Sequence, residues 1–347
     1  MLSRLKPKLG IVIPCYNEEP VIEETVRQLS AVLTGLMEEE LVTEDSFLLF
    51  VNDGSSDRTW ELIEQLHREY PWVAGLKLAA NVGHQSALLA GLMQAKNRAD
   101  CVISIDADLQ DDVRVIRDFV QKYREGYEVV YGVRRKRDTD TWFKRNSAIG
   151  FYKLMKRMGL KVVHNHADYR LMSRAALEHL SKFREVNLFL RGIVPLIGLR
   201  TTEVYYDRLE RFAGESKYPL KKMINFALEG ITSLSVEPIR FVTGSGFLCF
   251  AISLIVGILS LVSKLMGHTV SGWTSLMLSV WFIGGMVLIS LGLIGEYVGK
   301  IYKEVKSRPL YLIERDLPPL GSMLFEAGAD TVDMEHDIHG KVTSHGF

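Results

Sequence analysis

The sequence predicts an α/β domain, with a mostly parallel sheet and helices on both of its faces, followed by a pair of membrane-spanning helices. Three observations support this fold class. Short apolar runs alternate with helix-length segments over the first 210 residues, acidic side chains follow several of these runs, and two long stretches near the C-terminal end carry no charge. Strands that alternate with helices are typical of parallel sheets that are covered on both faces.

Five apolar runs are predicted to be strands, and the segments between them are predicted to be helices. In such sheets ligands bind beyond the carboxyl ends of the strands, so the residues that follow each run form the candidate site. The expected strands are residues 9–13, 47–51, 73–78, 101–105 and 128–131, and the expected helices are residues 20–36, 59–68, 85–96 and 111–125.

Charge and cysteine content limit the class of protein. The chain has 42 acidic and 42 basic side chains, so its net charge gives no reason to expect a nucleic-acid partner. Cys15, Cys101 and Cys249 lie in apolar runs, which suits buried thiols in a reducing compartment. The run at 9–13 is too short for a signal peptide. We therefore expect the catalytic part to be cytoplasmic.

Two charge-free stretches, 241–263 and 269–295, are each long enough to cross about 30 Å of hydrocarbon as a helix. The segment between them is short, so the two helices should form a hairpin. Lysines and arginines lie before and after the pair, which predicts that both ends face the cytoplasm. The alternative is a pair of buried core helices.

The segments around the hairpin have their own patterns. Residues 219–234 place apolar side chains on one face beside lysines, which predicts a helix in the membrane interface, or alternatively a helix that faces a protein core. The tail from Asp316 onward is acidic and poor in large apolar groups, so we expect it to be disordered. The expected organisation is a catalytic domain at 1–210, a basic connector at 211–240, two membrane helices within 241–298 and a cytoplasmic C-terminal segment at 299–347, disordered from about 318.

The most informative acidic motif is Asp106-Ala107-Asp108, directly after the strand expected at 101–105. Two carboxylates spaced this way can bind Mg²⁺ or Mn²⁺, and the metal can bridge them to the diphosphate of a nucleotide sugar. Asp53 follows another strand and suits a hydrogen bond to a base or ribose; alternatively it caps the helix that begins near Thr59, although Asp57 is the better cap. The glycine-rich loops of dehydrogenases and P-loop enzymes are absent.

Four motifs in order resemble family 2 glycosyltransferases of the GT-A fold: residues 12–18 (Val-Ile-Pro-Cys-Tyr-Asn-Glu), 51–57 (Val-Asn-Asp-Gly-Ser-Ser-Asp), 81–85 (Asn-Val-Gly-His-Gln) and 106–110 (Asp-Ala-Asp-Leu-Gln). Three later segments resemble the polyprenyl-phosphate glycosyltransferases, which include bactoprenol glucosyltransferases and are similar to dolichol-phosphate mannose synthase. These segments are 168–174, 187–192 and 211–218. The resemblance covers about residues 8 to 315, including the hairpin. Asn52 departs from it, because many relatives have a second aspartate there.

The resemblance implies a role for each matched position. Pro14, Tyr16, Glu18 and Asp53, together with Asp106, are expected to line the nucleotide-sugar site. Asp106 and Asp108 are expected to hold the metal, with Gln110 near the transferred sugar. The alternatives are that Pro14 only ends a strand and that Tyr16 only packs.

Asp168 is a candidate catalytic residue with an open role. Transfer to an alcohol needs a base, but a lipid phosphate is already anionic near neutral pH and can attack unaided. Asp168 therefore acts either as a base or as a group that positions substrate. The structural alternative is a salt bridge with Arg170 or Arg174.

Two phosphate-rich substrates require cationic side chains. Arg134, Arg191, Arg211 and Lys217 are the candidates for binding the lipid phosphate. The basic run at 134–137 has an alternative reading as a solvated loop that attracts anionic lipid.

The expected function is transfer of a hexose from a nucleotide sugar to a polyprenyl phosphate, with inversion at the anomeric carbon. The expected hexose is glucose, the expected donor is UDP-linked, and the expected acceptor is undecaprenyl phosphate. The product would be a lipid-linked sugar for modification of a cell-envelope glycan. The expected location is a bacterial cytoplasmic (inner) membrane, with several passes and both termini in the cytoplasm. A homo-oligomer, such as a tetramer, is the expected assembly. The alternatives are a membrane polysaccharide synthase, which would need more helices for a channel, and a non-catalytic membrane subunit that binds nucleotide or lipid.

Overall fold

An eight-stranded sheet forms the centre of the catalytic domain in the computed structural model, which describes residues 6–135, 166–186, 189–208, 237–266 and 272–320. The strand order across the sheet is β7-β5-β6-β4-β1-β2-β3-β8. The strands are β1 (Leu9–Cys15), β2 (Phe47–Asn52), β3 (Val73–Leu78), β4 (Cys101–Ser104), β5 (Val129–Arg134), β6 (His166–Ser173), β7 (Thr201–Tyr206) and β8 (Ile313–Leu317).

The middle of the sheet is parallel, as the sequence predicts. β3, β2, β1 and β4 run in one direction, and β5 and β7 are parallel to each other. β6 is antiparallel to both β4 and β5, and β8 is antiparallel to β3. The last three strands were not among those expected, because β6, β7 and β8 carry charged or polar side chains within them.

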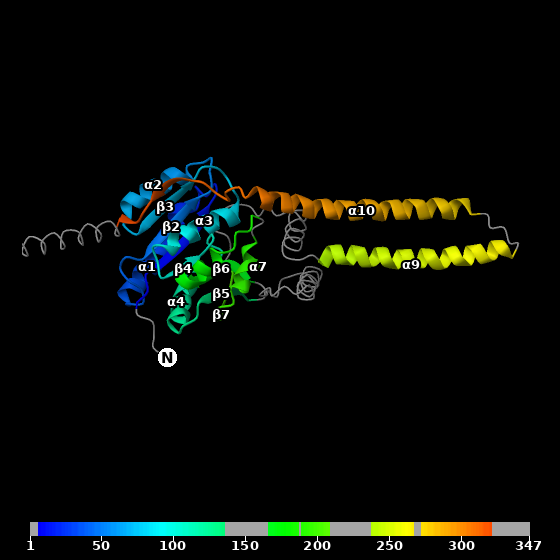
Figure 1. Cartoon of the computed structure of the whole chain (residues 1–347). Helices are drawn as coiled ribbons and strands as arrows, with labels where there is room; N and C mark the ends of the chain where they lie inside the picture. The colour runs from blue at the N-terminus through cyan, green and yellow to red at the C-terminus, as the bar shows by residue number, and fades with distance from the viewer. Residues whose placement is uncertain (1–5, 136–165, 187–188, 209–236, 267–271, 321–347) are drawn as a thin grey trace, which may run out of the picture.

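Helices cover both faces of the sheet (Figure 1). One face carries α1 (Ile22–Glu38), α2 (Thr59–Glu69) and α4 (Ile116–Arg124), and the other carries α3 (His84–Lys96), α6 (Arg174–Leu180) and α7 (Leu190–Ile193). The helix expected at 111–125 begins later and is preceded by a 3₁₀ turn, Val113–Val115, because the side chain of Asp112 accepts the N–H of Arg114. A second 3₁₀ turn, Val194–Ile197, follows α7.

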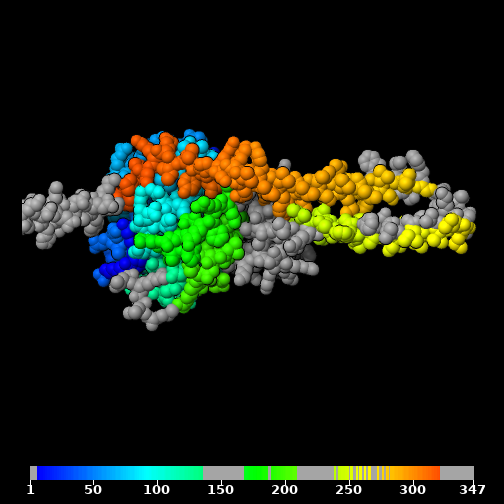
Figure 2. Space-filling model, viewed as in Figure 1, coloured from blue at the N-terminus to red at the C-terminus, as the bar shows by residue number. Residues whose placement is uncertain are grey.

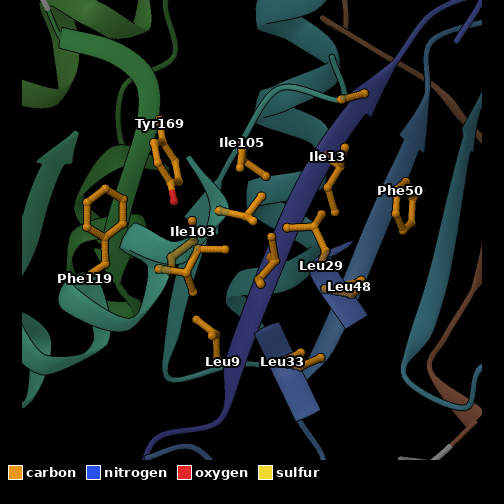
Figure 3. Close-up of a cluster of buried hydrophobic side chains, with 14 of the residues drawn as sticks. Leu9, Ile13, Leu29, Leu33, Leu48, Phe50, Ile103, Ile105, Phe119 and Tyr169 are labelled. Atoms are coloured by element: carbon orange, nitrogen blue, oxygen red, sulfur yellow. The ribbon is translucent and has the colours of Figure 1, made fainter. Parts of the chain in front are cut away.

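Side chains of alternating strand positions enter two separate cores. Ile11 and Ile13 of β1 pack with α1 in the first core (Figure 3), whereas Val12 points to α3 in the second. On α1, Leu29 and Leu33 complete a stripe that is fully buried. Burial of each such side chain contributes about 1.5–3 kcal/mol, so the two cores fix the central strands firmly.

Two long helices, α9 (Glu237–Leu265) and α10 (Trp273–Lys306), extend side by side from the catalytic domain (Figures 1 and 2). They contact each other, and Cys249 Sγ lies 3.5 Å from Met286 Sδ. Many of their apolar side chains face outward, as does Leu288, which is 71% exposed. Among the described residues, one helical stretch, Phe282–Lys306, is long and apolar enough to cross a membrane.

The C-terminal segment departs from the expectation of a disordered tail that begins at Asp316. β8 pairs with β3, and the Asp316 carboxylate accepts hydrogen bonds from Arg98 and Gln94. Leu317 packs against the first core, and Pro319 is buried. Pairing with the free edge of β3 supplies the order that composition alone did not predict. The rest of the tail, from 321, lies outside the described residues, as does the expected interfacial helix at 219–234.

Candidate active site

Within the described part of the chain, the polar side chains singled out in the sequence gather at one edge of the sheet. β1, β2, β4, β5 and β7 all end at this edge, and the antiparallel strand β6 begins there. Residues that follow these five parallel strands therefore lie close to residues in the first half of β6. This topology explains how positions more than 100 residues apart in the sequence, such as Asp53 and Asp168, reach the same side of the domain.

The loop after β4 presents two carboxylates and buries the residues beside them. Ala107 and Leu109 are buried, and the Ala107 carbonyl accepts the hydroxyl of Thr25 on α1 at 2.9 Å. Asp106 and Asp108 are only partly buried. Leu109 adopts a positive φ of 55°, and its buried side chain helps to hold the turn. The alternation of buried and half-buried residues directs both carboxylates away from the core.

The electrostatics of this loop favour a bound cation. The pKa of Asp106 is raised to about 6, chiefly by desolvation, against the effect of His84 and with smaller contributions from the carboxylates of Asp111, Asp168 and Asp108. The side chain of Asp106 is still 36% exposed, so it can reach a ligand. Within the described ranges no three His, Cys, Asp or Glu side chains form a metal-binding group. Two carboxylates still fit Mg²⁺ or Mn²⁺, which commonly take one or two protein carboxylates with the rest of their ligands from phosphate and water.

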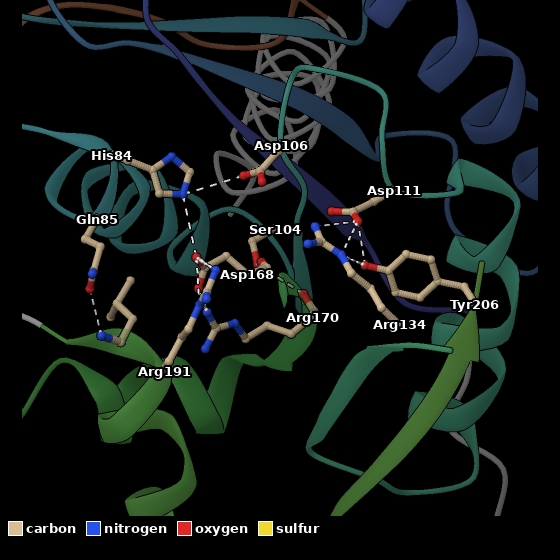
Figure 4. A network of polar contacts seen from close by, with 11 residues as sticks. His84, Gln85, Ser104, Asp106, Asp111, Arg134, Asp168, Arg170, Arg191 and Tyr206 are labelled. Atoms are coloured by element: carbon tan, nitrogen blue, oxygen red, sulfur yellow. Dashed lines mark hydrogen bonds and ion pairs between the residues drawn. The ribbon is translucent and has the colours of Figure 1, made fainter. Parts of the chain in front are cut away.

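Asp168 lies beside this loop in a dense ionic network (Figure 4). Its Oδ1 forms an ion pair with Arg170, which is 1% exposed, and its Oδ2 accepts Arg191 Nη2 at 3.0 Å. His84 Nε2 lies 3.5 Å from Asp106 and 3.8 Å from Asp168, so it stands between the two acids. Burial alone would raise the pKa of Asp168, but Arg170 and Arg191 hold it well below its ordinary range.

The salt bridge expected for Asp168 in its structural alternative is present, with the first of the two arginines named there. Arg170 does form a salt bridge with it, whereas Arg174 pairs with Asp100 at 3.1 Å. Arg191, expected at the lipid phosphate, is the second partner of Asp168 and remains 36% exposed. A carboxylate with two guanidinium partners is a weak proton acceptor, which favours a positioning role.

A second buried carboxylate, Asp111, organises the end of β5. Its Oδ1 accepts Arg134 Nη2 at 2.9 Å and the Tyr206 hydroxyl at 2.5 Å. Arg134 was expected to bind lipid phosphate, and its side chain is 28% exposed. Its guanidinium is thus held by Asp111 at the edge of the sheet. Nearby, the side-chain oxygen of Gln110 accepts a hydrogen bond from Arg208.

The residues expected at the nucleotide occupy different environments. Tyr16 is 49% exposed and available for stacking, whereas Pro14 is buried within β1, one residue before the end of the strand. Glu18 is half-buried and its N–H donates to Thr59.

Both carboxylate oxygens of Asp53 accept backbone N–H groups, from Val82 at 2.7 Å and Gly83 at 3.0 Å. Gly83 has a φ of 87°, which favours glycine and ends the loop at the start of α3. Asp53 therefore holds this loop and does not cap α2; Asp57 accepts the Thr59 N–H there, as expected.

Two of the expected cationic residues, Arg211 and Lys217, lie outside the described residues. Two residues that join the network, His84 and Asp111, carried no predicted role, and Arg170 was expected only as a structural partner of Asp168. His84 lies inside one of the matched motifs and is the first residue of α3, directly after its N-cap glycine; that position was the available signal. Asp111 immediately follows the motif at 106–110.

Comparison with known proteins gives consistent matches. A family model described as glycosyl transferase family 2 matches residues 10–181. A Bacillus subtilis protein described as an uncharacterized glycosyltransferase, YkoT, is 60% identical over 316 residues, which are 91% of this chain and 94% of that protein. The bactoprenol glucosyl transferase of Shigella phage SfII is 41% identical over 313 residues, 89% of this chain and 98% of that protein.

Among solved structures, the chain resembles glucosyl-3-phosphoglycerate synthase from Mycobacterium tuberculosis, crystallised with Mn²⁺, UDP-glucose and phosphoglyceric acid. The two share 20% identity with a TM-score of 0.40, covering 66% of this chain and 78% of that one.

Proposed function

The chain belongs to glycosyltransferase family 2, and on this premise we propose that it transfers glucose from a UDP-linked donor to undecaprenyl phosphate with inversion at the anomeric carbon. The family match and the mostly parallel sheet confirm the expected α/β GT-A class. The choice of sugar and acceptor is supported by relatives named bactoprenol glucosyl transferase, at 39–41% identity over most of the chain. The single structural observation that carries the proposal is the pairing of an acidic loop with a cationic network at one sheet edge.

The acidic loop suits the donor. Asp106 and Asp108 would hold Mg²⁺ or Mn²⁺, which supplies positive charge to the diphosphate of the leaving nucleotide. Tyr16, half exposed after β1, is available to stack on the base. Asp53 contributes by holding the loop that precedes α3, and Gln110 is the candidate contact to the transferred sugar.

The cationic network suits the acceptor. A phosphate monoester carries its own negative charge, so its oxygen forms the new bond to the anomeric carbon as the bond to the diphosphate oxygen breaks, and that electron pair leaves with UDP. No proton has to be removed in this step. The depressed pKa of Asp168, caused by Arg170 and Arg191 against the effect of burial, supports a role in placing Arg191.

The length of the two helices and their outward-facing apolar side chains support a membrane arrangement. We propose that α9 and α10 cross the bilayer as a hairpin, with 241–263 and 269–295 as the spans and the catalytic domain in the cytoplasm. The last turn of α10 reaches the catalytic domain, since Glu304 accepts the N–H of Val186 at 3.0 Å. A span that ends near 295 leaves this turn outside the hydrocarbon. We also propose that the chain forms a homo-oligomer, as expected from the sequence. Chemical crosslinking in membranes tests this, and a single monomer band would contradict it.

Transfer of radiolabelled sugar tests the proposed function. Membranes that contain the protein are supplied with UDP-glucose, undecaprenyl phosphate and Mg²⁺ or Mn²⁺, and label is measured in the organic extract. We expect label in the lipid fraction, and its loss in Asp108→Asn without change in the unfolding temperature. Asp118→Asn, an exposed acid on α4, serves as the matched control and should retain transfer. Absence of label from every nucleotide sugar tried would refute the proposal.

A further inference from the structure

Two backbone N–H groups in the segment that precedes Arg191 donate hydrogen bonds to side chains from distant parts of the chain. Glu304, in the last turn of α10, accepts the N–H of Val186 at 3.0 Å. Gln85, in the first turn of α3, accepts the N–H of Leu190 at 2.9 Å (Figure 4). The first hydrogen bond involves α10, which extends away from the catalytic domain, and the second involves α3, which packs on the central sheet.

The helix that carries Arg191 needs such support. α7 contains four residues, too few to be stable without tertiary contacts. Its N-cap residue, Phe189, provides no side-chain hydrogen bond to the first turn. Leu190 and Ile193 are buried and fix the depth of α7 in the second core. Burial does not fix a direction, whereas the hydrogen bond that the first N–H of α7 donates to Gln85 does.

The orientation of α7 decides where the guanidinium of Arg191 lies. Arg191 donates to Asp168 Oδ2 from Nη2 at 3.0 Å and from Nε at 3.3 Å, and its side chain keeps 36% exposure. The residue before Gln85 is His84, which lies 3.5 Å from Asp106. The first turn of α3 thus contacts the acidic loop with one side chain and α7 with the next.

We propose that Gln85 and Glu304 are positioning residues, which hold α7 so that Arg191 meets the acceptor phosphate in register with the donor site. Glu304 places the same segment relative to the membrane helix from which the lipid acceptor approaches. This inference rests on the proposed function, because it assigns Arg191 to the acceptor. Neither Gln85 nor Glu304 touches the substrates.

Steady-state transfer kinetics of the full chain in detergent micelles or membranes test the inference, with UDP-glucose and undecaprenyl phosphate varied separately. Loss of a neutral hydrogen bond is worth about 1 kcal/mol, so we expect Gln85→Ala to raise the acceptor KM about threefold to tenfold. The Glu304 carboxylate is charged, and loss of a hydrogen bond to a charged group is worth about 1.5–3 kcal/mol, so Glu304→Ala should raise the acceptor KM about tenfold or more. The donor KM should stay within about twofold. Gln85→Glu and Glu304→Gln keep an acceptor oxygen and should restore the wild-type acceptor KM. Gln65→Ala, which removes a surface hydrogen bond to Glu69 on α2, is the matched control.

A double-mutant cycle shows whether these residues act through Arg191. In an Arg191→Ala background, Gln85→Ala and Glu304→Ala should add no further increase in acceptor KM. Additive effects, or equal increases in the donor and acceptor KM, would overturn the inference. If Gln85→Ala does not fold, as judged from its unfolding temperature, the Glu304 arm and the two conservative variants still decide it. Wild-type protein that transfers no sugar to polyprenyl phosphate would overturn the proposed function and, with it, this inference.

Discussion

Replacement of Asp168 by asparagine tests the ionic network most directly. The substitution keeps the size and shape of the side chain but removes the negative charge between two guanidinium groups. Arg170 is 1% exposed, and its Nε and Nη1 have no hydrogen-bond partner among the described residues, so Asp168 carries most of its compensation. Removing one partner of a buried ion pair leaves an uncompensated buried charge.

The expected cost follows from the burial of the partners. Breaking a buried pair typically destabilises a protein by about 3–5 kcal/mol, and we expect the lower end, about 3 kcal/mol, because Arg191 is partly exposed and keeps some solvation. For a domain of this size each kcal/mol lowers the unfolding temperature by about 2–4 °C, so the shift should be about 6–12 °C.

Thermal unfolding of the full chain in detergent, followed by circular dichroism, measures the shift. Asp207→Asn is the matched control, because the ion pair of Asp207 with Arg135 is exposed on both sides, at 73% and 62%. Such pairs contribute about 0–1 kcal/mol, so the control should unfold within about 4 °C of the wild type. A shift for Asp168→Asn no larger than that of the control would refute the assignment of Asp168 as the counter-charge of Arg170.

Three further predictions concern separate parts of the molecule. The pKa of Asp106 in the folded state is raised to about 6, so protons compete with the metal below that pH. The Kd for Mn²⁺, measured by calorimetry, should therefore rise about tenfold for each pH unit below 6 and change little between pH 7 and 8. Gly91→Ala should destabilise the domain by about 1–3 kcal/mol in denaturant titrations, since the new Cβ would lie 2.4 Å from Val12 and 2.7 Å from Val51; an unchanged midpoint would contradict this packing. Asp316→Ala should lower stability by about 1–2 kcal/mol in the same titrations through loss of its partly buried ion pair, and wild-type stability would show that β8 does not depend on it.

The sequence predicted the parallel centre of the sheet and the acidic loop because both depend on local patterns. The strands from β1 to β4 are apolar enough to be buried on both faces, and this pattern requires no knowledge of their partners. Asp106 and Asp108 follow such a strand, so their place at the carboxyl edge was accessible from the sequence.

The remaining features depend on partners far away in the chain. β6 contains Asp168 and Arg170, and two charged side chains make a sequence look unlike a buried strand. In the folded domain the two charges neutralise each other. β8 carries three successive charged side chains and is ordered by pairing with β3, more than 230 residues earlier. Arg134 was expected at the lipid phosphate because of its charge. In the folded domain it pairs with Asp111, whose buried carboxylate requires a cation. The burial of Asp111 could not be read from the sequence.

The pairing of β8 with β3 also has a consequence for the order of biosynthesis. β1 to β7 leave the ribosome before α9 and α10, whereas β8 follows both helices. During translation the edge of β3 therefore stays unpaired until the two apolar helices have been made, and an exposed strand edge is prone to pair with other chains. If the two helices cross the membrane as the proposed hairpin, β8 reaches β3 only after α10 has led the chain back to the α/β domain, so the sheet is closed last. A chain cut short before β8 would keep this edge open, and an open strand edge is a site at which chains associate wrongly.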